Sequence, residues 1–440
     1  MEKKIKKVWI SKDNPSIQRT EEKCINCGQC QKTCWEKTGI KYDKRKVNEP
    51  ICINCGQCIL TCPTGALSTK YDYKKVLNYI YDTDKTVIIS VAPATRVAIG
   101  EEFGFEAGSF LEGKMVAALK AIGFSYVFDV TFGADLTIIE EANEFVERLS
   151  SGKNLPQFTS CCPSWIKYIE IYHPDLISHL STAKSPIAMQ ASIIRTYFRR
   201  LKDIDPGEII NVIVVPCAAK KYEIKRSEVQ GIDFAITTLE LAMMIRECNI
   251  DFSSLANESF DCILGKGSSA GLIFGASGGV MEASLRTVYS LLTGLKAPAT
   301  ILNFTTLRGN KGLKEAIINI NKKEIRIAVV DGLINFENIL PKLKSYDFIE
   351  VMNCPGGCVG GSGQPIMAVN KTESIIAQRI NSLYKNGSTL EHQCSHNNPD
   401  ILNVYRCFLG KPQNKTCQDL LHTSYSSKED LFKKKKGLTK

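Results

Sequence analysis

The feature that most constrains this chain is a cysteine motif that occurs twice near its N-terminus. The two copies read Cys24-Ile-Asn-Cys27-Gly-Gln-Cys30 and Cys52-Ile-Asn-Cys55-Gly-Gln-Cys58, and a fourth cysteine follows each at the same spacing, as Cys34 and Cys62. Three thiolates on one tight loop can bind three corners of an iron–sulfur cube, and the fourth thiolate, beyond a turn, is directed to the other cube. The repeat therefore predicts a small unit built around two metal clusters.

This double pattern is the ligand signature of bacterial ferredoxins with two 4Fe–4S clusters. One cluster is expected to bind Cys24, Cys27, Cys30 and Cys62. The other is expected to bind Cys34, Cys52, Cys55 and Cys58. Gly28 and Gly56 allow the backbone to fold close to the inorganic sulfides, whereas Trp35 departs from the proline that Pro63 supplies in the second copy. Zinc ribbons and a disulfide cage are the alternatives, and the double pattern disfavours both.

Composition narrows the class of protein further. The chain has 440 residues, 44% of them hydrophobic, which predicts about three globular domains. No apolar run approaches the length of a membrane span, and the basic start is not followed by an apolar signal segment. Because the chain has 18 cysteines and no export signal, we expect them to bind metal in a reducing compartment. This compartment is expected to be the cytoplasm, with an organelle as the alternative. We expect no membrane or nucleic-acid partner. The net charge of +10 suits an acidic partner or simply solubility.

Hydrophobic patterning divides the chain into three parts. Residues 1–75 form the predicted ferredoxin-like α+β domain, 76–371 a large two-lobed α/β domain with mostly parallel sheets, and 372–440 a helical extension with a basic tail. Short apolar runs predict strands at 87–92, 126–130, 209–215, 325–330 and 348–351. Helical patterns cover 111–121, 134–149, 187–200 and 239–247. Their alternation favours parallel sheets covered by helices.

Three loops of the large domain carry further cysteines. They read Thr159-Ser-Cys-Cys-Pro-Ser-Trp165, Val215-Pro-Cys-Ala-Ala-Lys-Lys-Tyr-Glu223 and Glu350-Val-Met-Asn-Cys-Pro-Gly-Gly-Cys-Val-Gly-Gly-Ser-Gly-Gln-Pro365. Loops that follow different strands converge in α/β proteins, and Pro163 is well placed to begin a helix capped near Cys162. Four cysteines in three such loops indicate a third iron–sulfur cluster.

These loops resemble the three signature motifs of the iron-only (FeFe) hydrogenases, TSCCPxW, MPCxxKxxE and ExMxCxxGCxxGGGxP. The resemblance also covers residues 92–96, 132–138, 273–281 and 420–425, and with the ferredoxin unit it spans nearly the whole chain. It implies a 4Fe–4S cubane held by Cys162, Cys217, Cys354 and Cys358. It further implies that Cys358 bridges to a di-iron unit with CO, cyanide and an azadithiolate bridge. Cys161 would exchange protons with the bridging amine, Lys220 would bond a cyanide, and Met352 would pack on the di-iron unit.

A proton must also cross the protein to reach such a site. Glu141 and Glu144 lie three residues apart on a predicted helix and therefore share a face. In the resembled family, carboxylates at these places and a serine matching Ser181 carry protons to the cysteine. A solvated acidic face that includes Glu140 and Glu147 is the alternative from the residues alone. Glu223 is either a structural partner of Lys220 or a relay, and the sequence does not separate the two.

The chain departs from the family pattern at four positions, which are Val215, Ala218, Ala219 and Ser362. A shorter residue at 215 fills the di-iron pocket less tightly, and the alanines remove hydroxyls that could bond the cubane sulfides. We expect an altered catalytic bias and an altered sensitivity to oxygen or CO, with the chemistry retained.

The resemblance implies reversible reduction of protons to dihydrogen. Electrons would come from ferredoxin or a similar small carrier, and maturation proteins would build the di-iron unit. A hydrogen sensor and an iron–sulfur assembly relative are the alternatives. No motif identifies the physiological direction of the reaction, the electron donor, the oligomeric state or the oxygen tolerance.

Overall fold

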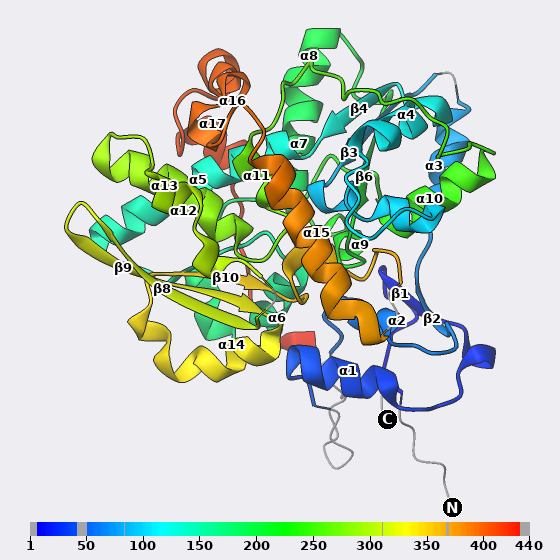
Figure 1. Ribbon diagram of the computed structural model, residues 1–440, viewed down its shortest axis with the longest axis horizontal. Helices are drawn as coiled ribbons and strands as arrows, with labels where there is room; N and C mark the ends of the chain where they lie inside the picture. The colour runs from blue at the N-terminus through cyan, green and yellow to red at the C-terminus, as the bar shows by residue number, and fades with distance from the viewer. Residues whose placement is uncertain (1–6, 42–50, 83, 310, 367–368, 432–440) are drawn as a thin grey trace, which may run out of the picture.

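The cysteine repeat folds into a small unit at one end of the molecule (Figure 1). The structure is a computed structural model, and it describes residues 7–41, 51–82, 84–309, 311–366 and 369–431. Strands β1 (Ile17–Arg19) and β2 (Leu67–Thr69) pair antiparallel, and helices α1 (Gln29–Thr38) and α2 (Gln57–Leu60) carry the two motifs. Each helix begins directly after the motif glycine, and Gly28 and Gly56 have φ of +88° and +72°, which favours glycine.

The first lobe of the large domain is a parallel sheet of order β4-β3-β6-β7. Its strands are β3 (Thr86–Val91), β4 (Tyr126–Asp129), β6 (Ile209–Val215) and β7 (Phe234–Thr237). Helices α3 (Tyr73–Ile80), α4 (Glu112–Ile122) and α10 (Thr238–Glu247) pack on one face. Helix α5 (Thr131–Ser151) and helix α7 (Pro186–Ile193) pack on the other. The continuous apolar strands of the sequence are therefore buried on both faces.

The second lobe is a sheet of order β5-β10-β9-β8. Its strands are β5 (Gln157–Phe158), β8 (Leu313–Ile320), β9 (Lys323–Asp331) and β10 (Phe348–Met352). Strands β5, β10 and β9 are parallel, whereas β8 pairs antiparallel with β9. The sequence analysis did not predict β8, because this edge strand alternates buried and exposed residues and so lacks a continuous apolar run.

Helix α5 lies between the two sheets and contributes to the core of both lobes. Helices α6 (Pro163–Tyr172) and α14 (Leu333–Ile339) cover one face of the second sheet, and α12 (Gly279–Thr293) covers the other. The helix predicted at 187–200 is present, but a π-helical turn at Ile194–Phe198 separates α7 from α8 (Arg199–Lys202). Three short helices complete the large domain, namely α9 (Lys220–Glu223), α11 (Ser269–Ile273) and α13 (Ala299–Leu302).

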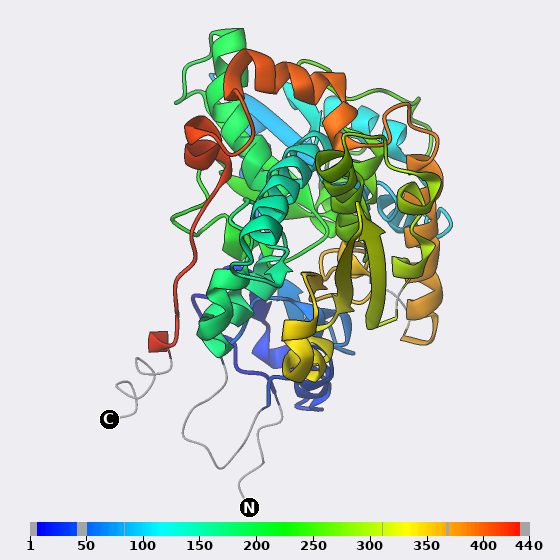
Figure 2. The same cartoon turned by 90° about the vertical axis from the view of Figure 1, so that its left-hand side faces the viewer.

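The C-terminal part wraps around the outside of the two lobes. It consists of α15 (Thr372–Gly387), α16 (Pro399–Val404) and α17 (Lys415–Leu421), followed by an extended segment that runs back toward the cysteine unit (Figure 2). This segment pairs His422 with Ala183 and joins Lys428 to the buried Glu170 by an ion pair of 2.6 Å. The basic tail at 432–440 lies outside the described residues.

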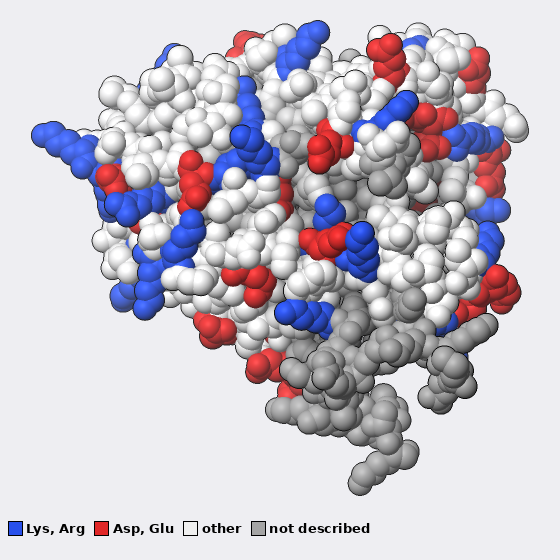
Figure 3. All heavy atoms as spheres, turned by 60° about the horizontal axis from the view of Figure 1, so that its bottom comes forward, with Lys and Arg blue, Asp and Glu red and all other residues white. Residues whose placement is uncertain are grey.

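The surface shows no single-sign patch on the face seen in Figure 3, where Lys, Arg, Asp and Glu side chains are interspersed over the described residues. Within the same ranges, none of the helices has the length and apolar character needed to cross a membrane.

Candidate active site and its cysteine sets

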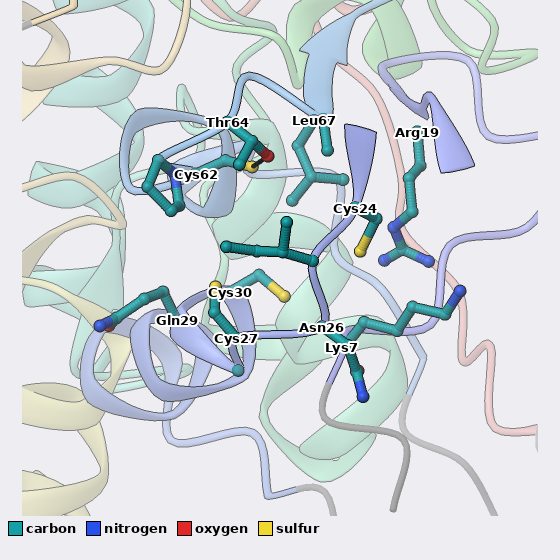
Figure 4. Close-up of a pocket in the computed structure, with 14 residues that line it drawn as sticks. Lys7, Arg19, Cys24, Asn26, Cys27, Gln29, Cys30, Cys62, Thr64 and Leu67 are labelled. Atoms are coloured by element: carbon teal, nitrogen blue, oxygen red, sulfur yellow. Dashed lines mark hydrogen bonds between the residues drawn. The ribbon is translucent and has the colours of Figure 1, made fainter. Parts of the chain in front are cut away.

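The first predicted ligand set surrounds one pocket near the surface. Figure 4 shows Cys24, Cys27, Cys30 and Cys62 around this pocket, with Lys7 and Arg19 at its edge. The backbone N–H of Val8 donates to Sγ of Cys30 over 3.3 Å. Cys27 is exposed, so the pocket lies at the surface of the protein. The grouping is the one expected from the spacing of the motif.

The second predicted set lies deeper. Burial raises the pKa of Cys58, and the nearby thiolates of Cys55, Cys52 and Cys34 raise it further. Sγ of Cys52 accepts from the backbone N–H of Asn54 over 3.4 Å. These four sulfurs therefore lie near one another. This placement agrees with the prediction that Cys34, from the first motif, binds the cluster of the second motif.

A single metal ion needs several ligands that converge on one point. No three His, Cys, Asp or Glu side chains converge on a single-ion position anywhere in the described part of the chain. Thiolates that bind the corners of an iron–sulfur cube stand further apart than the ligands of a tetrahedral zinc ion.

The four cysteines of the large domain come together where the two sheets end. Cys162 is the N-cap residue of α6, Cys217 follows β6, and Cys354 and Cys358 follow β10. Burial raises the pKa of Cys217 and of Cys358 to about 12, and neighbouring thiolates add to both shifts. Cys354 is buried and the other three cysteines are partly exposed. Four thiolates this close together repel one another unless a cation offsets their charge, so this donor set fits an iron–sulfur cluster.

Cys161 lies beside this set, in an apolar cluster against which Cys162 also packs. It packs against Met352, Ile138 and Phe274 in a small apolar cluster. Burial raises its pKa well above the ordinary value, and the Glu141 carboxylate raises it further. Nζ of Lys220 donates to the backbone oxygen of Cys161 over 3.1 Å. The Cys161 thiol thus lies near the Glu141 carboxyl group and the Lys220 ammonium.

Several buried polar side chains lie on the side of Cys161 that faces α5. Glu141 and Glu144 lie on α5 with exposures of only 1% and 7%, so the solvated acidic face is excluded. Ser181 Oγ donates to Glu144 Oε2 over 2.7 Å. Both oxygens of Glu141 lack a hydrogen-bond partner, although Ser181 and the Ser160 backbone lie close enough to lower its pKa slightly.

Desolvation dominates the chemistry of Glu141. Burial, and then the charge of Glu144, raises its pKa to about 8. A carboxyl group with this pKa can gain and lose a proton near neutral pH.

Sequence reasoning missed Arg148, which closes the outer end of this chain. Its guanidinium donates to Glu144 Oε1 over 2.6 Å and to the backbone oxygen of Leu180 over 2.8 Å. Arg148 stands four residues after Glu144, and this spacing on a helix is a signal that could have identified it.

Glu223 holds Lys220 in place. Its Oε2 lies 2.5 Å from Nζ of Lys220, and the hydroxyl of Ser185 donates to its Oε1. Burial lowers the pKa of Lys220, but the Glu223 carboxylate and the thiolates of Cys161 and Cys358 together raise it above its ordinary value, so the ammonium stays charged. These contacts favour the structural role among the two alternatives for Glu223.

Known proteins share this arrangement. A family model described as the iron-only hydrogenase large subunit, C-terminal domain, matches residues 85–362. The chain belongs to the iron-only hydrogenase family. In this hydrogenase, the iron hydrogenase small subunit model matches residues 373–428, and a 4Fe–4S binding domain matches 45–68.

Individual relatives agree with the family. The hydrogenase is 40% identical over 445 residues to the NADP-reducing hydrogenase subunit HndD of Solidesulfovibrio fructosivorans, covering 94% of this chain and 75% of that protein. It is 37% identical over 448 residues to iron hydrogenase 1 of Clostridium pasteurianum, covering 96% and 78%. The solved apo-hydrogenase of Chlamydomonas reinhardtii matches with a TM-score of 0.71 at 35% identity, covering 80% of this chain and 98% of that one.

The hydrogenase is thus an oxidoreductase with an α/β fold, iron–sulfur clusters and the active-site cluster of its family. More distant relatives include cytosolic iron-sulfur assembly component 3 of Bos taurus, which is 30% identical over 368 residues, covering 79% of this chain and 76% of that protein.

The structure gives one departure from the family pattern a physical role. The Ser362 hydroxyl donates to the backbone oxygen of Cys55 over 2.8 Å and accepts from the backbone N–H of Ala218 over 3.3 Å. It therefore links the second ferredoxin-type loop to the loop that follows β6. Val215 is buried in an apolar cluster with Ile213 and Ala235.

We expect the combined substitution Val215→Met and Ala218→Ser to change the ratio of hydrogen oxidation to hydrogen evolution. The larger apolar side chain changes the packing around residue 215. The added hydroxyl offers a hydrogen bond to a sulfide of the proposed cubane, which changes the energy of the reduced state by about 1 kcal/mol. The two rates, measured on the same matured preparation, provide the ratio. A ratio equal to that of the unsubstituted protein would refute this expectation.

Proposed function

We propose that this hydrogenase catalyses the reversible reduction of protons to dihydrogen, with electrons passing through two 4Fe–4S clusters to the active-site cluster. The observation that carries the proposal is the contact between the second cysteine set and the catalytic loops. Ser362, four residues after Cys358, donates through its hydroxyl to the backbone oxygen of Cys55 over 2.8 Å, so the two sets lie close to each other. A relay of clusters at short separation is what electron transfer requires.

Each site residue has a proposed role in this reaction. The cubane would be held by Cys162, Cys217, Cys354 and Cys358, with Cys358 also reaching the di-iron unit. This cluster would supply the redox chemistry by which dihydrogen is formed or split. Lys220 would bond a cyanide ligand, Met352 would pack on the di-iron unit, and Cys161 would exchange protons with the bridging amine. Protons would then move through Glu141, Ser181 and Glu144 to the surface near Arg148.

The arrangement of the domains supports electron transfer between the ferredoxin-like unit and the active-site cluster. We assign residues 1–75 to electron entry, 76–371 to catalysis and 372–440 to an extension that wraps the catalytic part. The exposed Cys27, with Lys7 and Arg19 beside its pocket, provides a point of entry for an acidic carrier such as a ferredoxin. The proposed setting is cytoplasmic, with maturation proteins as partners in assembling the di-iron unit.

An iron–sulfur assembly protein and a hydrogen sensor are the competing functions. Neither an assembly protein nor a sensor needs a buried path that delivers protons fast enough for rapid turnover. We propose that the side chains of Cys161, Glu141, Ser181 and Glu144 form such a path, which the hydrogen bond from Ser181 to Glu144 and the raised pKa of Glu141 support. The path favours a turnover enzyme.

Infrared spectroscopy and a turnover assay separate the three functions. After anaerobic maturation we expect bands of bound CO and cyanide, together with rapid hydrogen evolution from reduced methyl viologen. Absence of the bands after maturation would identify an assembly relative. Bands without rapid turnover would identify a sensor.

A further inference from the structure

A side chain of the ferredoxin-like unit reaches the catalytic cysteines. Gln57 stands at the start of α2 between Cys55 and Cys58, and only 4% of its surface is exposed. Its Nε2 lies 3.1 Å from Sγ of Cys354 and 3.2 Å from the backbone oxygen of Gly360. One amide group of the second cluster loop therefore bonds a proposed ligand of the active-site cubane.

The direction of these two bonds follows from their partners. A thiolate sulfur and a carbonyl oxygen are both acceptors, and the amide nitrogen of glutamine carries two N–H donors. The opposite amide orientation would place a third acceptor against the two acceptors already there. Nε2 of Gln57 therefore donates one N–H to Cys354 and the other to Gly360.

The internal repeat supplies a natural comparison. Gln29 occupies the same place in the first motif, between Cys27 and Cys30, but it is exposed. Figure 4 shows its side chain pointing away from the cysteines that line the pocket. Because the local sequence is the same in both copies, the position of Gln57 results from the packing of the second loop against the catalytic domain.

That packing leaves no spare space. A Cβ atom placed on Gly56 would lie 2.3 Å from Oγ of Ser362 and 3.1 Å from Cβ of Ala218. The glycine thus allows the second motif to approach the catalytic loops closely. This approach brings the Gln57 amide within hydrogen-bonding distance of Cys354.

We propose that Gln57 is a positioning residue that raises the reduction potential of the active-site cubane through its hydrogen bond to Cys354. The inference rests on the proposed ligation by Cys354. A hydrogen bond to a ligand sulfur stabilises the additional negative charge of the reduced cluster, so its loss disfavours reduction. Since Gln57 shares a helical turn with Cys58, the same bond ties the active-site cubane to the neighbouring ferredoxin-type cluster.

Infrared spectroelectrochemistry of the matured full-length protein tests the proposal. The bands of bound CO and cyanide report the redox state of the adjoining cubane, independently of turnover. The substitution Gln57→Met keeps a side chain of similar length without the donor, and Gln29→Met is the matched control. We expect Gln57→Met to lower the equilibrium constant for reduction of the cubane by about fivefold and Gln29→Met to leave it unchanged.

An unchanged potential in Gln57→Met would overturn the proposal. If that variant does not assemble its clusters, the unsubstituted protein decides the matter by pulsed EPR after ¹⁵N is placed in the glutamine side-chain amide. A nitrogen coupling to the reduced active-site cubane that changes with the label supports the hydrogen bond, and its absence overturns it. If the unsubstituted protein shows no CO or cyanide bands, the proposed function fails, and the inference fails with it.

Discussion

Replacing Cys161 by serine is expected to lower hydrogen evolution by at least about 10²-fold while leaving the cluster content unchanged. General acid–base groups contribute rate factors of about this size or more, and a serine hydroxyl is a far weaker acid than a thiol. Cys161 packs against Met352 and lies beside the proposed ligands without belonging to them. The loss should therefore fall on proton exchange and not on assembly.

The measurement is hydrogen evolution from reduced methyl viologen, with iron content determined on the same sample. Cys417→Ser is the matched control, because Cys417 is also a buried free thiol but packs in a different core. The proposed role of Cys161 fails if Cys161→Ser retains more than about a tenth of the activity, since general acid–base catalysis contributes at least about 10²-fold. It also fails if the variant loses iron, because Cys161 would then be a ligand.

Replacing Glu141 by glutamine is expected to stabilise the protein at neutral pH and to inactivate it. The folded-state pKa of Glu141 is raised to about 8 from an ordinary value of 4.5. As the pH rises from 4.5 to 8, the unfolded chain releases this proton and the folded chain retains it, so the folded state loses stability progressively. At pH 7 the raised pKa of Glu141 lowers the free energy of unfolding by at most about 3 kcal/mol. Glutamine, which carries no ionisable group, removes this loss.

Thermal unfolding midpoints of the two proteins, measured anaerobically from pH 5 to pH 8, test this expectation. The advantage of Glu141→Gln should be small at pH 5 and should grow with pH, while its activity falls by about 10²-fold or more. Glu147→Gln, an exposed change on the same helix, should alter neither quantity. A stability difference that does not depend on pH would show that Glu141 is ionised in the folded protein.

Cys161 and Glu141 also show how much of the site can be predicted from the sequence. The pair Cys161-Cys162 was recognisable from its motif, because Pro163 begins a helix and so places Cys162 at the N-cap and Cys161 directly before it. Glu141 was recognisable only by resemblance, since its helix has acidic residues on several faces. Its burial depends on where α5 lies between the two sheets, which no local pattern encodes.

The duplicated motif, the three cysteine loops and the alternation of strands and helices determined the cluster-binding character and the α/β fold class. Ligand spacing along the chain sets which sulfurs can share a cluster, and apolar runs set which strands are buried on both faces. Tertiary structure alone decided that Gln57 bonds Cys354 while its counterpart Gln29 stays at the surface. Identical local sequences differ here because one copy is desolvated against another domain, and desolvation depends on neighbours that are distant in the chain.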